Sequence, residues 1–390
     1  MTTTPVGSPG IYDAIVVGVG GMGSAACYHL ARRGLRTLGL ERFDIPHAMG
    51  SSHGITRIIR LAYYEHPSYV PLLLRAFELW DDLERESERR LLEVTGTIDA
   101  SGPDEIVFTG ALASCENFGL EHEVLTSAEL TARYPGYQLP PSHLALFQPR
   151  GGFLLPERCI SAHVEGALGV GADIRARERV IDWEPLGDGV LVTTDRGVYQ
   201  AGSLVLAAGA WMASLVPALA GLVEPERQVL GWFAPLQPAL FAPERFPVFN
   251  LMVPEGRYYG FPQYDVPGFK IGLYHHLQER VDPDDFQREA NAADEAPLRE
   301  ATARYFPAAN GPTMALRTCM FTNTPDEHFI VDVLPEFPQV VVASPCSGHG
   351  FKFASVIGEV LADLAQNGET RHDIGLLRLS RFVEEPVSAR

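Results

Sequence analysis

Two lysines are the side chains of this sequence best suited to a chemical role. Of the 31 lysine and arginine residues, only Lys270 and Lys352 are lysines, so the chain uses arginine almost everywhere else. Lysine offers a compact charge with a tunable pKa, and arginine does not. We therefore expect lysine where arginine cannot replace it; two ordinary surface lysines are the alternative.

A glycine-rich turn near the N-terminus has the spacing of a dinucleotide-binding fingerprint. A β-branched apolar run precedes it, an alanine-rich helical pattern follows it, and a second apolar run ends at Glu41. Gly18 is expected to make the tight turn, Gly20 to admit the pyrophosphate, and Gly23 to let the helix pack closely. Glu41 is expected to accept hydrogen bonds from the adenosine ribose, which disfavours NADP. The fingerprint alone leaves NAD and FAD open.

Two later segments repeat the strand-then-glycine pattern. Residues 190–208 predict a hairpin that feeds a strand ending in a glycine turn, and residues 340–343 predict a strand. The turn after this second strand holds Gly348 and Gly350 and leads into a helix, whose N–H groups can hold anionic atoms. Such separated segments suit a nucleotide-binding domain assembled from distant parts of the chain.

Composition excludes several classes of protein. The chain has 390 residues, 46% of them hydrophobic and 21% charged, which is typical of a folded protein of two domains. Its net charge of -18 repels phosphate backbones and anionic lipids, so neither a nucleic acid nor a membrane surface is expected as a partner. The uncharged stretch 197–223 contains glycines and a proline, and predicts a strand, a turn and a short helix instead of a membrane span.

The cysteines predict a reducing environment. There are five, too few and too irregularly spaced for a disulfide framework, and no CxxC metal site is expected. No secretory signal is read at the N-terminus, so a cytoplasmic location is expected.

Four motifs together make the sequence similar to the family of monomeric sarcosine oxidase and N-methyltryptophan oxidase. These flavoproteins belong to the glycine oxidase and D-amino-acid oxidase superfamily, and the resemblance runs from about residue 12 to residue 382. It implies a monomer that binds FAD and oxidises an N-methyl or other secondary amino acid to an imine, with dioxygen reduced to hydrogen peroxide. The motifs are Gly18–Gly23 with Glu41, Ser52–Arg60, Cys319–Ile330 and Ser347–Phe353.

The resemblance also implies roles for single residues. Cys319 would attach FAD covalently through its sulfur, and we expect it at a strand end; an inert buried thiol is the alternative. Arg60 and Lys352 would bind the substrate carboxylate, while Lys270 would activate dioxygen. Arg60 could instead belong to a solvated basic face, and Lys352 could lie along an apolar surface. The other implied positions are Arg57 close to the flavin, His53, Thr56, Val180, Gly348 and Gly350 at the cofactor, and Tyr259 and His275 in the substrate pocket, His275 only with a one-residue insertion.

Three departures from the family pattern bear on the substrate. Phe321 stands where a pocket tyrosine is usual, Ile55 where an aspartate is common, and Leu61 where a histidine is common. All three changes make the neighbourhood more apolar. We therefore expect a secondary amino acid bulkier than sarcosine.

The expected fold is mixed α/β and α+β. A discontinuous Rossmann-like FAD-binding domain would comprise residues 1–82, 146–224 and 315–390, and a mixed-sheet substrate domain residues 83–145 and 225–314. Two alternatives stay open: a related amine dehydrogenase with another electron acceptor, and a flavin-binding protein without turnover.

Overall fold

Alternating chain segments build two compact units in the computed structural model, which describes residues 10–382. The first unit comprises the chain up to Ser52, Glu157–Glu224 and the chain from Thr322; the second comprises His53–Pro156 and Pro225–Phe321. The expected mixed α/β and α+β fold class is confirmed, because helices accompany a largely parallel sheet in one unit and a mixed sheet in the other.

The units differ from the expected domains in three segments. Residues 53–82, 146–156 and 315–321 belong to the second unit, not to the nucleotide-binding one. Strand pairing explains the first two differences, because β3 (Arg57–Ile59) pairs with β8 (Gly152–Leu154). It also explains the third, because most of β17 (Thr313–Asn323) lies in the second unit, where it pairs with β13 (Glu224–Phe233).

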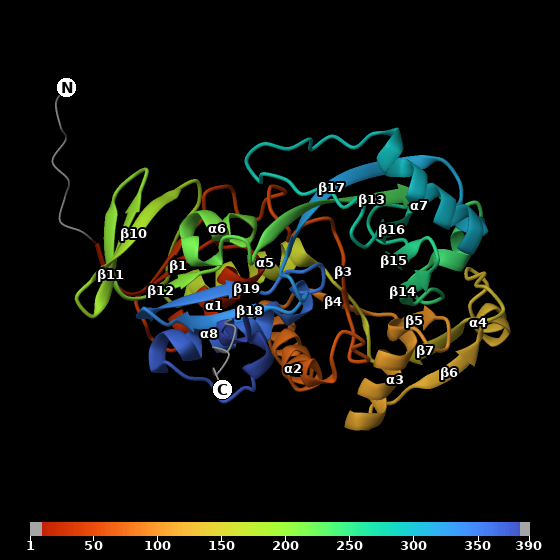
Figure 1. Cartoon of the computed structure of the whole chain (residues 1–390), viewed down its shortest axis with the longest axis horizontal. Helices are drawn as coiled ribbons and strands as arrows, with labels where there is room; N and C mark the ends of the chain where they lie inside the picture. The colour runs from red at the N-terminus through yellow and green to blue at the C-terminus, as the bar shows by residue number, and fades with distance from the viewer. Residues whose placement is uncertain (1–9, 383–390) are drawn as a thin grey trace, which may run out of the picture. The chain divides into compact units, whose positions relative to one another are not determined.

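A sheet of eight strands forms the centre of the first unit (Figure 1). β1 lies between β2 and β12, and all three run parallel, as the βαβ pattern predicts. β19 extends the parallel part beyond β12, and β9 extends it beyond β2. The strands are β1 (Gly10–Val17), β2 (Thr37–Leu40), β9 (Asp173–Arg175), β10 (Val180–Leu186), β11 (Gly189–Thr194), β12 (Val198–Leu206), β18 (Ile330–Leu334) and β19 (Phe337–Ser344).

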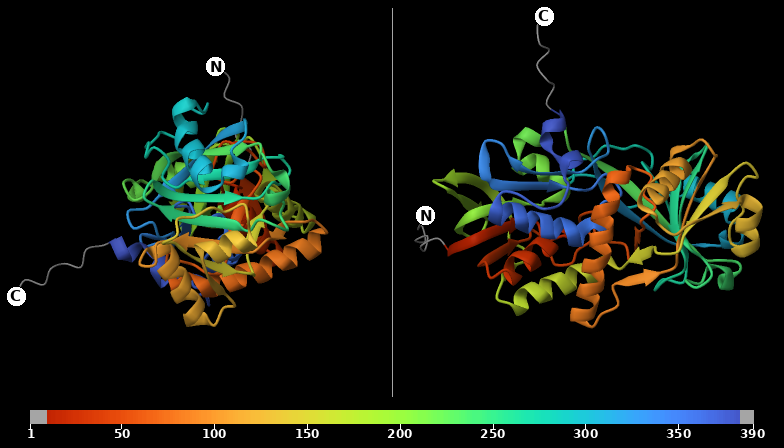
Figure 2. Two further views of the ribbon diagram at one scale, coloured as in Figure 1. Left: turned by 90° about the vertical axis from the view of Figure 1, so that its right-hand side faces the viewer. Right: turned by 90° about the horizontal axis from the view of Figure 1, so that it is seen from below.

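Two helices from opposite ends of the chain pack together in this unit. α1 (Gly21–Arg32) lies beside α8 (Ala354–Asn367), as Figure 2 shows. Their backbones approach closely, since a Cβ at Gly358 would lie 2.4 Å from the Cβ of Ala25. The other helices are α5 (Pro156–Gly169) and α6 (Met212–Leu215).

A second sheet, also of eight strands, forms the other unit in the order β17-β13-β16-β15-β14-β5-β7-β6. Its strands are β5 (Thr97–Ser101), β6 (Glu123–Thr126), β7 (Leu144–Gln148), β13 (Glu224–Phe233), β14 (Val248–Val253), β15 (Gly256–Phe261), β16 (Phe269–Leu273) and β17 (Thr313–Asn323). A small sheet combines β3 (Arg57–Ile59), β4 (Leu92–Val94) and β8 (Gly152–Leu154), and the helices are α2 (Val70–Ser87), α3 (Ile106–Phe118), α4 (Ser127–Arg133) and α7 (Ala292–Tyr305).

Alternation along β15 and β16 gives the second sheet two different faces. Tyr258, Phe269 and Ile271 point into an aromatic and aliphatic core that also holds residues of α7. Their neighbours Tyr259 and Lys270 therefore point to the opposite face. The core fixes the register, because a shift by one residue would bury the lysine among phenylalanines.

The uncharged stretch 197–223 folds as predicted. It forms β12, a turn at Gly209 and the short helix α6. Within residues 10–382, no helix combines the length and the apolarity that crossing a membrane requires.

Buried histidines predict how the stability of the first unit depends on pH. His163 in α5 is 2% exposed, and burial holds its pKa well below 6.5. Burial also lowers the pKa of His29 in α1 to about 4. The unfolded chain binds these protons more readily, so their contribution is complete above pH 6.5 and is lost as the pH falls towards 4. We expect the free energy of unfolding, measured with urea, to be lower at pH 5 than at pH 7.5.

A pair of variants separates this effect from general acid denaturation. His163→Phe should flatten the pH dependence, because it removes one of the depressed groups. His66→Gln, at an exposed position, should leave it unchanged. Equal slopes in all three proteins would contradict the prediction.

Candidate cofactor and active site

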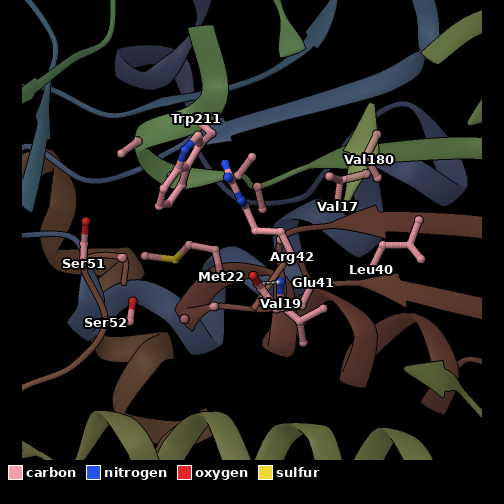
Figure 3. A pocket seen from close by; sticks show the side chains of 18 of the residues that line it. Val17, Val19, Met22, Leu40, Glu41, Arg42, Ser51, Ser52, Val180 and Trp211 are labelled. Atoms are coloured by element: carbon pink, nitrogen blue, oxygen red, sulfur yellow. Dashed lines mark hydrogen bonds between the residues drawn. The ribbon is translucent and has the colours of Figure 1, made fainter. Parts of the chain in front are cut away.

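A pocket of about 200 Å³ opens in the first unit at the C-terminal ends of its parallel strands (Figure 3). The turn after β1, Glu41 after β2, Ala207–Trp211 after β12 and Cys346 after β19 all line it, and so does Val180. Ligands of open α/β sheets bind in such a position.

The three fingerprint glycines have different steric surroundings. Gly18 has a φ of +87°, which favours glycine, and a Cβ there would lie 2.6 Å from the carbonyl oxygen of Ala207. A Cβ at Gly23 would lie 1.7 Å from the carbonyl oxygen of Gly18, so only glycine lets α1 begin there. A Cβ at Gly20 would meet no protein atom within 4 Å, so this residue borders open space.

Glu41 ties the glycine turn to the segment that follows β2. Its buried carboxylate accepts hydrogen bonds from the backbone N–H groups of Val19, at 2.9 Å, and Phe43, at 3.0 Å. Val19 and Glu41 meet in Figure 3. A carboxylate has about four lone-pair positions, so two further donors such as ribose hydroxyls can be accommodated.

Gly348, Gly350 and Lys352 lie in the first unit, between β19 and α8. Gly348 has a φ of +74°, and a Cβ at Gly350 would lie 1.6 Å from the carbonyl oxygen of Pro345. Lys352 is 4% exposed and donates a hydrogen bond of 2.5 Å to the carbonyl of His349. The lysine is thus buried, and it does not lie along an exposed apolar surface.

Lys270 is the centre of a second group of residues, all in the second unit. Its ammonium donates to the carbonyl oxygens of Gly54 (2.7 Å) and Thr56 (2.9 Å) and to the Thr56 hydroxyl (2.8 Å). The side chain is 2% exposed, and its Nζ lies 4.3 Å from the ring centre of Phe261. The protein therefore fixes one positive charge in a largely apolar place.

The turn at Ile55, whose neighbours accept the hydrogen bonds of Lys270, is strained. Ile55 has a φ of +74°, a region that β-branched residues rarely adopt and that costs on the order of 1–3 kcal/mol. Lys270 bonds to both neighbours of Ile55, so the ammonium helps to hold this conformation.

Arg57 and Cys319 meet beside this turn. An Arg57 guanidinium nitrogen lies 3.5 Å from Cys319 Sγ, and the guanidinium also donates to the carbonyl of Thr56 at 2.9 Å. The expectation that Cys319 ends a strand is wrong, because β17 continues to Asn323. The strand extends because Phe321 and Thr322 follow Cys319, and aromatic and β-branched residues favour an extended backbone.

Further expected site residues lie in the same unit. Burial raises the pKa of Tyr259, while Arg57 acts in the opposite direction. His275 lies 3.1 Å from a carboxylate oxygen of Glu226, and its ring centre lies 6.3 Å from that of Phe321. His53 and Thr56 are both buried.

Arg60 already has anionic partners inside the protein. Its guanidinium binds both oxygens of Glu65, at 2.6 and 2.8 Å, and lies 3.8 Å from Asp99. It is 2% exposed and is stacked over the ring of Tyr64 at 4.2 Å. The alternative of a solvated basic face is therefore wrong, and a substrate carboxylate would have to share Arg60 with Glu65.

Comparison with known proteins decides the family. The family described as FAD dependent oxidoreductase (DAO) matches residues 13–364. The chain belongs to this family. It is 42% identical to monomeric sarcosine oxidase from Bacillus sp. (strain NS-129), over 95% of this chain and 97% of that protein. It is 34% identical to N-methyl-L-tryptophan oxidase from Salmonella enteritidis PT4, over 95% and 99%.

Solved structures of amino acid oxidases have the same fold. NikD, an unusual amino acid oxidase essential for nikkomycin biosynthesis, has a TM-score of 0.82 at 26% identity and covers 95% of this chain and 97% of its own. Glycine oxidase from Geobacillus kaustophilus has a TM-score of 0.77 at 21% identity, covering 96% and 100%.

The residues of the first unit fit FAD. Gly20 leaves open the space that a pyrophosphate needs, α1 directs its N-terminal N–H groups there, and Glu41 lies at the end of the adjacent strand. Among residues 10–382, no cluster of three or more histidine, cysteine or acidic side chains could hold a metal ion.

Gly20→Ala should lower FAD binding without unfolding this FAD oxidoreductase. The added methyl group meets no protein atom, so we expect it to occupy ligand space. The ratio of flavin to protein, read from the absorbance spectrum, should fall several-fold while the melting temperature of apoprotein stays within about 2 °C. Gly23→Ala, with its 1.7 Å contact, is the contrasting variant and should lower both. Full flavin content in Gly20→Ala would contradict the role of the glycine turn.

Some partners of the site residues were not predicted from the sequence. Glu65 lies only five residues after Arg60, so a nearby carboxylate was a usable signal. Asp99 accepts a hydrogen bond from Asn250 at 2.7 Å, across 151 residues, and no local spacing indicates that contact.

Proposed function

We propose that the protein is an FAD-dependent oxidase of secondary amino acids. It oxidises the C–N bond of an N-methyl or other secondary amino acid to an imine, and dioxygen is reduced to hydrogen peroxide. Relatives named sarcosine oxidase and N-methyl-L-tryptophan oxidase, at 34–42% identity over 95% of the chain, support this activity. The observation that carries it is the buried ammonium of Lys270 on the sheet face that also presents Tyr259 and Cys319.

Cys319 would hold FAD covalently through its sulfur: an S–C bond would replace the thiol S–H bond and one C–H bond of the flavin 8α carbon, and the two electrons left on the flavin would pass to dioxygen. The sulfur lies 3.5 Å from a guanidinium nitrogen of Arg57, the residue expected close to the flavin. Burial raises the pKa of Cys27 and Cys115 to about 12, so those thiols stay protonated and unreactive.

Side chains of the protein hold the substrate and stabilise the negative charge that develops on dioxygen. Arg60 and Lys352 bind the carboxylate of the amino acid, which enters as the neutral amine, and Tyr259 and His275 line its site. FAD, when bound, takes two electrons from the substrate and passes them to dioxygen. Lys270 stabilises the negative charge that forms on reduced oxygen, because its ammonium is fixed and sheltered from water. Positioning supplies much of the rate, since this mechanism assigns no residue the role of a strong base.

The protein works as a monomer in a reducing compartment such as the cytoplasm. Among residues 10–382, which contain all five cysteines, no disulfide is formed, and thiols suit that environment.

Anaerobic titration of the yellow protein tests the activity. We expect secondary amino acids to bleach the flavin absorbance and air to restore it with one hydrogen peroxide per turnover. Bleaching without peroxide formation would favour the amine dehydrogenase, and flavin that stays oxidised with every secondary amino acid would favour a non-catalytic protein.

Substrate size is a separate prediction. Ile55 packs beside Cys319 in an apolar cluster, Phe321 is 8% exposed, and Leu61 is fully in the interior. A ligand that covers about 60 Å² more apolar surface at Ile55 and Phe321 gains on the order of 1.5 kcal/mol, or about tenfold in specificity. We expect kcat/KM for N-methyltryptophan, N-methylphenylalanine, N-methylleucine or pipecolate to exceed that for sarcosine. A higher value for sarcosine than for all of them would exclude an apolar pocket.

A further inference from the structure

Arg257 and Tyr274 form a tight stack on the second unit, on the Tyr259 face of β15. The Arg257 guanidinium lies 3.4 Å from the ring centre of Tyr274, and their backbones are joined by a hydrogen bond of 2.8 Å from the Tyr274 N–H to the Arg257 carbonyl. A cation over an aromatic face is attracted by the ring quadrupole, more strongly where water is excluded. The stack therefore fixes the orientation of the Tyr274 ring.

A second tyrosine connects this stack to Arg60. The ring of Tyr64, which is 4% exposed, lies 5.6 Å from the Arg257 guanidinium and 4.2 Å from that of Arg60. Guanidinium groups and rings thus alternate from Arg60 to Tyr274. The series starts at the group proposed to bind the substrate carboxylate.

The same stack continues to Phe321. The ring centres of Tyr274 and Phe321 lie 5.1 Å apart, within the range of aromatic pairs. Phe321 follows Cys319 by two residues in β17, so both side chains point to one face of the sheet. Tyr274 follows Lys270 by four residues, just beyond the end of β16, and alternation puts it on the Lys270 face. The two rings therefore lie on the sheet face that also carries the residues proposed to attach the flavin and to activate dioxygen.

We propose that Tyr274 and Phe321 form an aromatic wall that packs against the side chain of the substrate, and that Arg257 is a positioning residue for Tyr274. This inference rests on the proposed function and narrows its substrate to secondary amino acids with an aromatic side chain. Such a side chain adds ring–ring contact to the apolar area that any bulky substrate buries. Sarcosine has no side chain to reach the wall, so the wall discriminates against it.

Four variants test the wall. Tyr274→Leu keeps most of the apolar volume but removes the ring, and should lower kcat/KM for N-methyltryptophan about tenfold, mainly through KM, while kcat/KM for sarcosine changes less than twofold. Tyr274→Phe should retain the preference. Arg257→Met should resemble Tyr274→Leu, and Arg257→Lys, which keeps a cation, should recover most of the loss. Melting temperatures verify that all four proteins fold.

A binding measurement tests the aromatic wall without requiring turnover. Indole-3-acetate has an aromatic ring and a carboxylate but no oxidisable amine, and its Kd can be read from the perturbed flavin spectrum. We expect Tyr274→Leu to weaken the binding of indole-3-acetate about tenfold and to leave the binding of acetate unchanged.

Three outcomes would contradict the aromatic wall. Equal losses of affinity for indole-3-acetate and acetate, or equal losses of kcat/KM for N-methyltryptophan and sarcosine, would overturn it. A preference for N-methylglutamate that Arg257→Met abolishes would also overturn it, since Arg257 would then bind a carboxylate directly. If no secondary amino acid bleaches the flavin, the proposed function fails, and the indole-3-acetate titration still decides the wall.

Discussion

Replacing Cys319 with serine should convert a covalently bound flavin into one that acid releases. Precipitation with trichloroacetic acid should leave the unmodified protein yellow, whereas the Cys319→Ser pellet should be colourless with free FAD in the supernatant. The reason is chemical, because a serine oxygen at that position cannot form the thioether that a cysteine thiolate forms. Absorbance of pellet and supernatant measures the result, and the expected change is close to complete.

Cys346→Ser is the matched control. Cys346 lines the pocket of the first unit and, like Cys319, forms no disulfide, so the same substitution there should leave the flavin in the pellet. Free FAD in the supernatant of the unmodified protein would rule out covalent attachment. A colourless pellet for Cys346→Ser alone would move the attachment to that residue.

Replacing Lys270 with methionine should slow the reaction of the reduced flavin with dioxygen more than a hundredfold. A loss of about 3 kcal/mol in stabilisation of the developing charge accounts for that factor. Methionine keeps the length of the side chain but removes the ammonium and its three hydrogen bonds to Gly54 and Thr56. Stopped-flow absorbance, with anaerobic reduction and aerobic reoxidation measured separately, gives the two rates.

Thr56→Val separates charge from positioning. It removes one of the hydrogen bonds that Lys270 makes but keeps the cation, so reoxidation should slow far less than in Lys270→Met. If Lys270→Met slowed reduction and reoxidation equally, the lysine would serve substrate binding or the strained turn at Ile55 and not oxygen reduction.

Local sequence patterns predicted the parts of the site that are local in the fold. The glycine turn, α1 and Glu41 lie within about 25 residues, and their steric requirements can be inferred from residue type alone. Lys270 was also a usable signal, because lysine is rare in this arginine-rich chain. Its contact with Thr56 was not predictable from spacing, since 214 residues separate the two.

Long-range strand pairing accounts for what the sequence did not predict. The assignment of residues 53–82 and 315–321 depends on which distant strand each segment joins, and apolar patterns carry no such information. The sequence predicted Cys319 at the end of a strand, and its position inside one was missed for a related reason. The polar residues after it resemble a turn, but β17 extends through the first two of them, Thr322 and Asn323.

Because segments of the two units alternate along the chain, they are synthesised in a fixed order that delays completion of the first unit. β1, α1 and β2 leave the ribosome first, but β19 and α8, which complete their sheet and cover α1, are about 300 residues later in the chain. At usual translation rates that interval lasts on the order of tens of seconds. During it, the apolar face of α1 lacks its partner helix, and β12, once made, lacks the strand β19 that later pairs with its edge. The complete nucleotide-binding sheet therefore forms late in synthesis, and a nascent chain that stalls before Thr322 cannot assemble it.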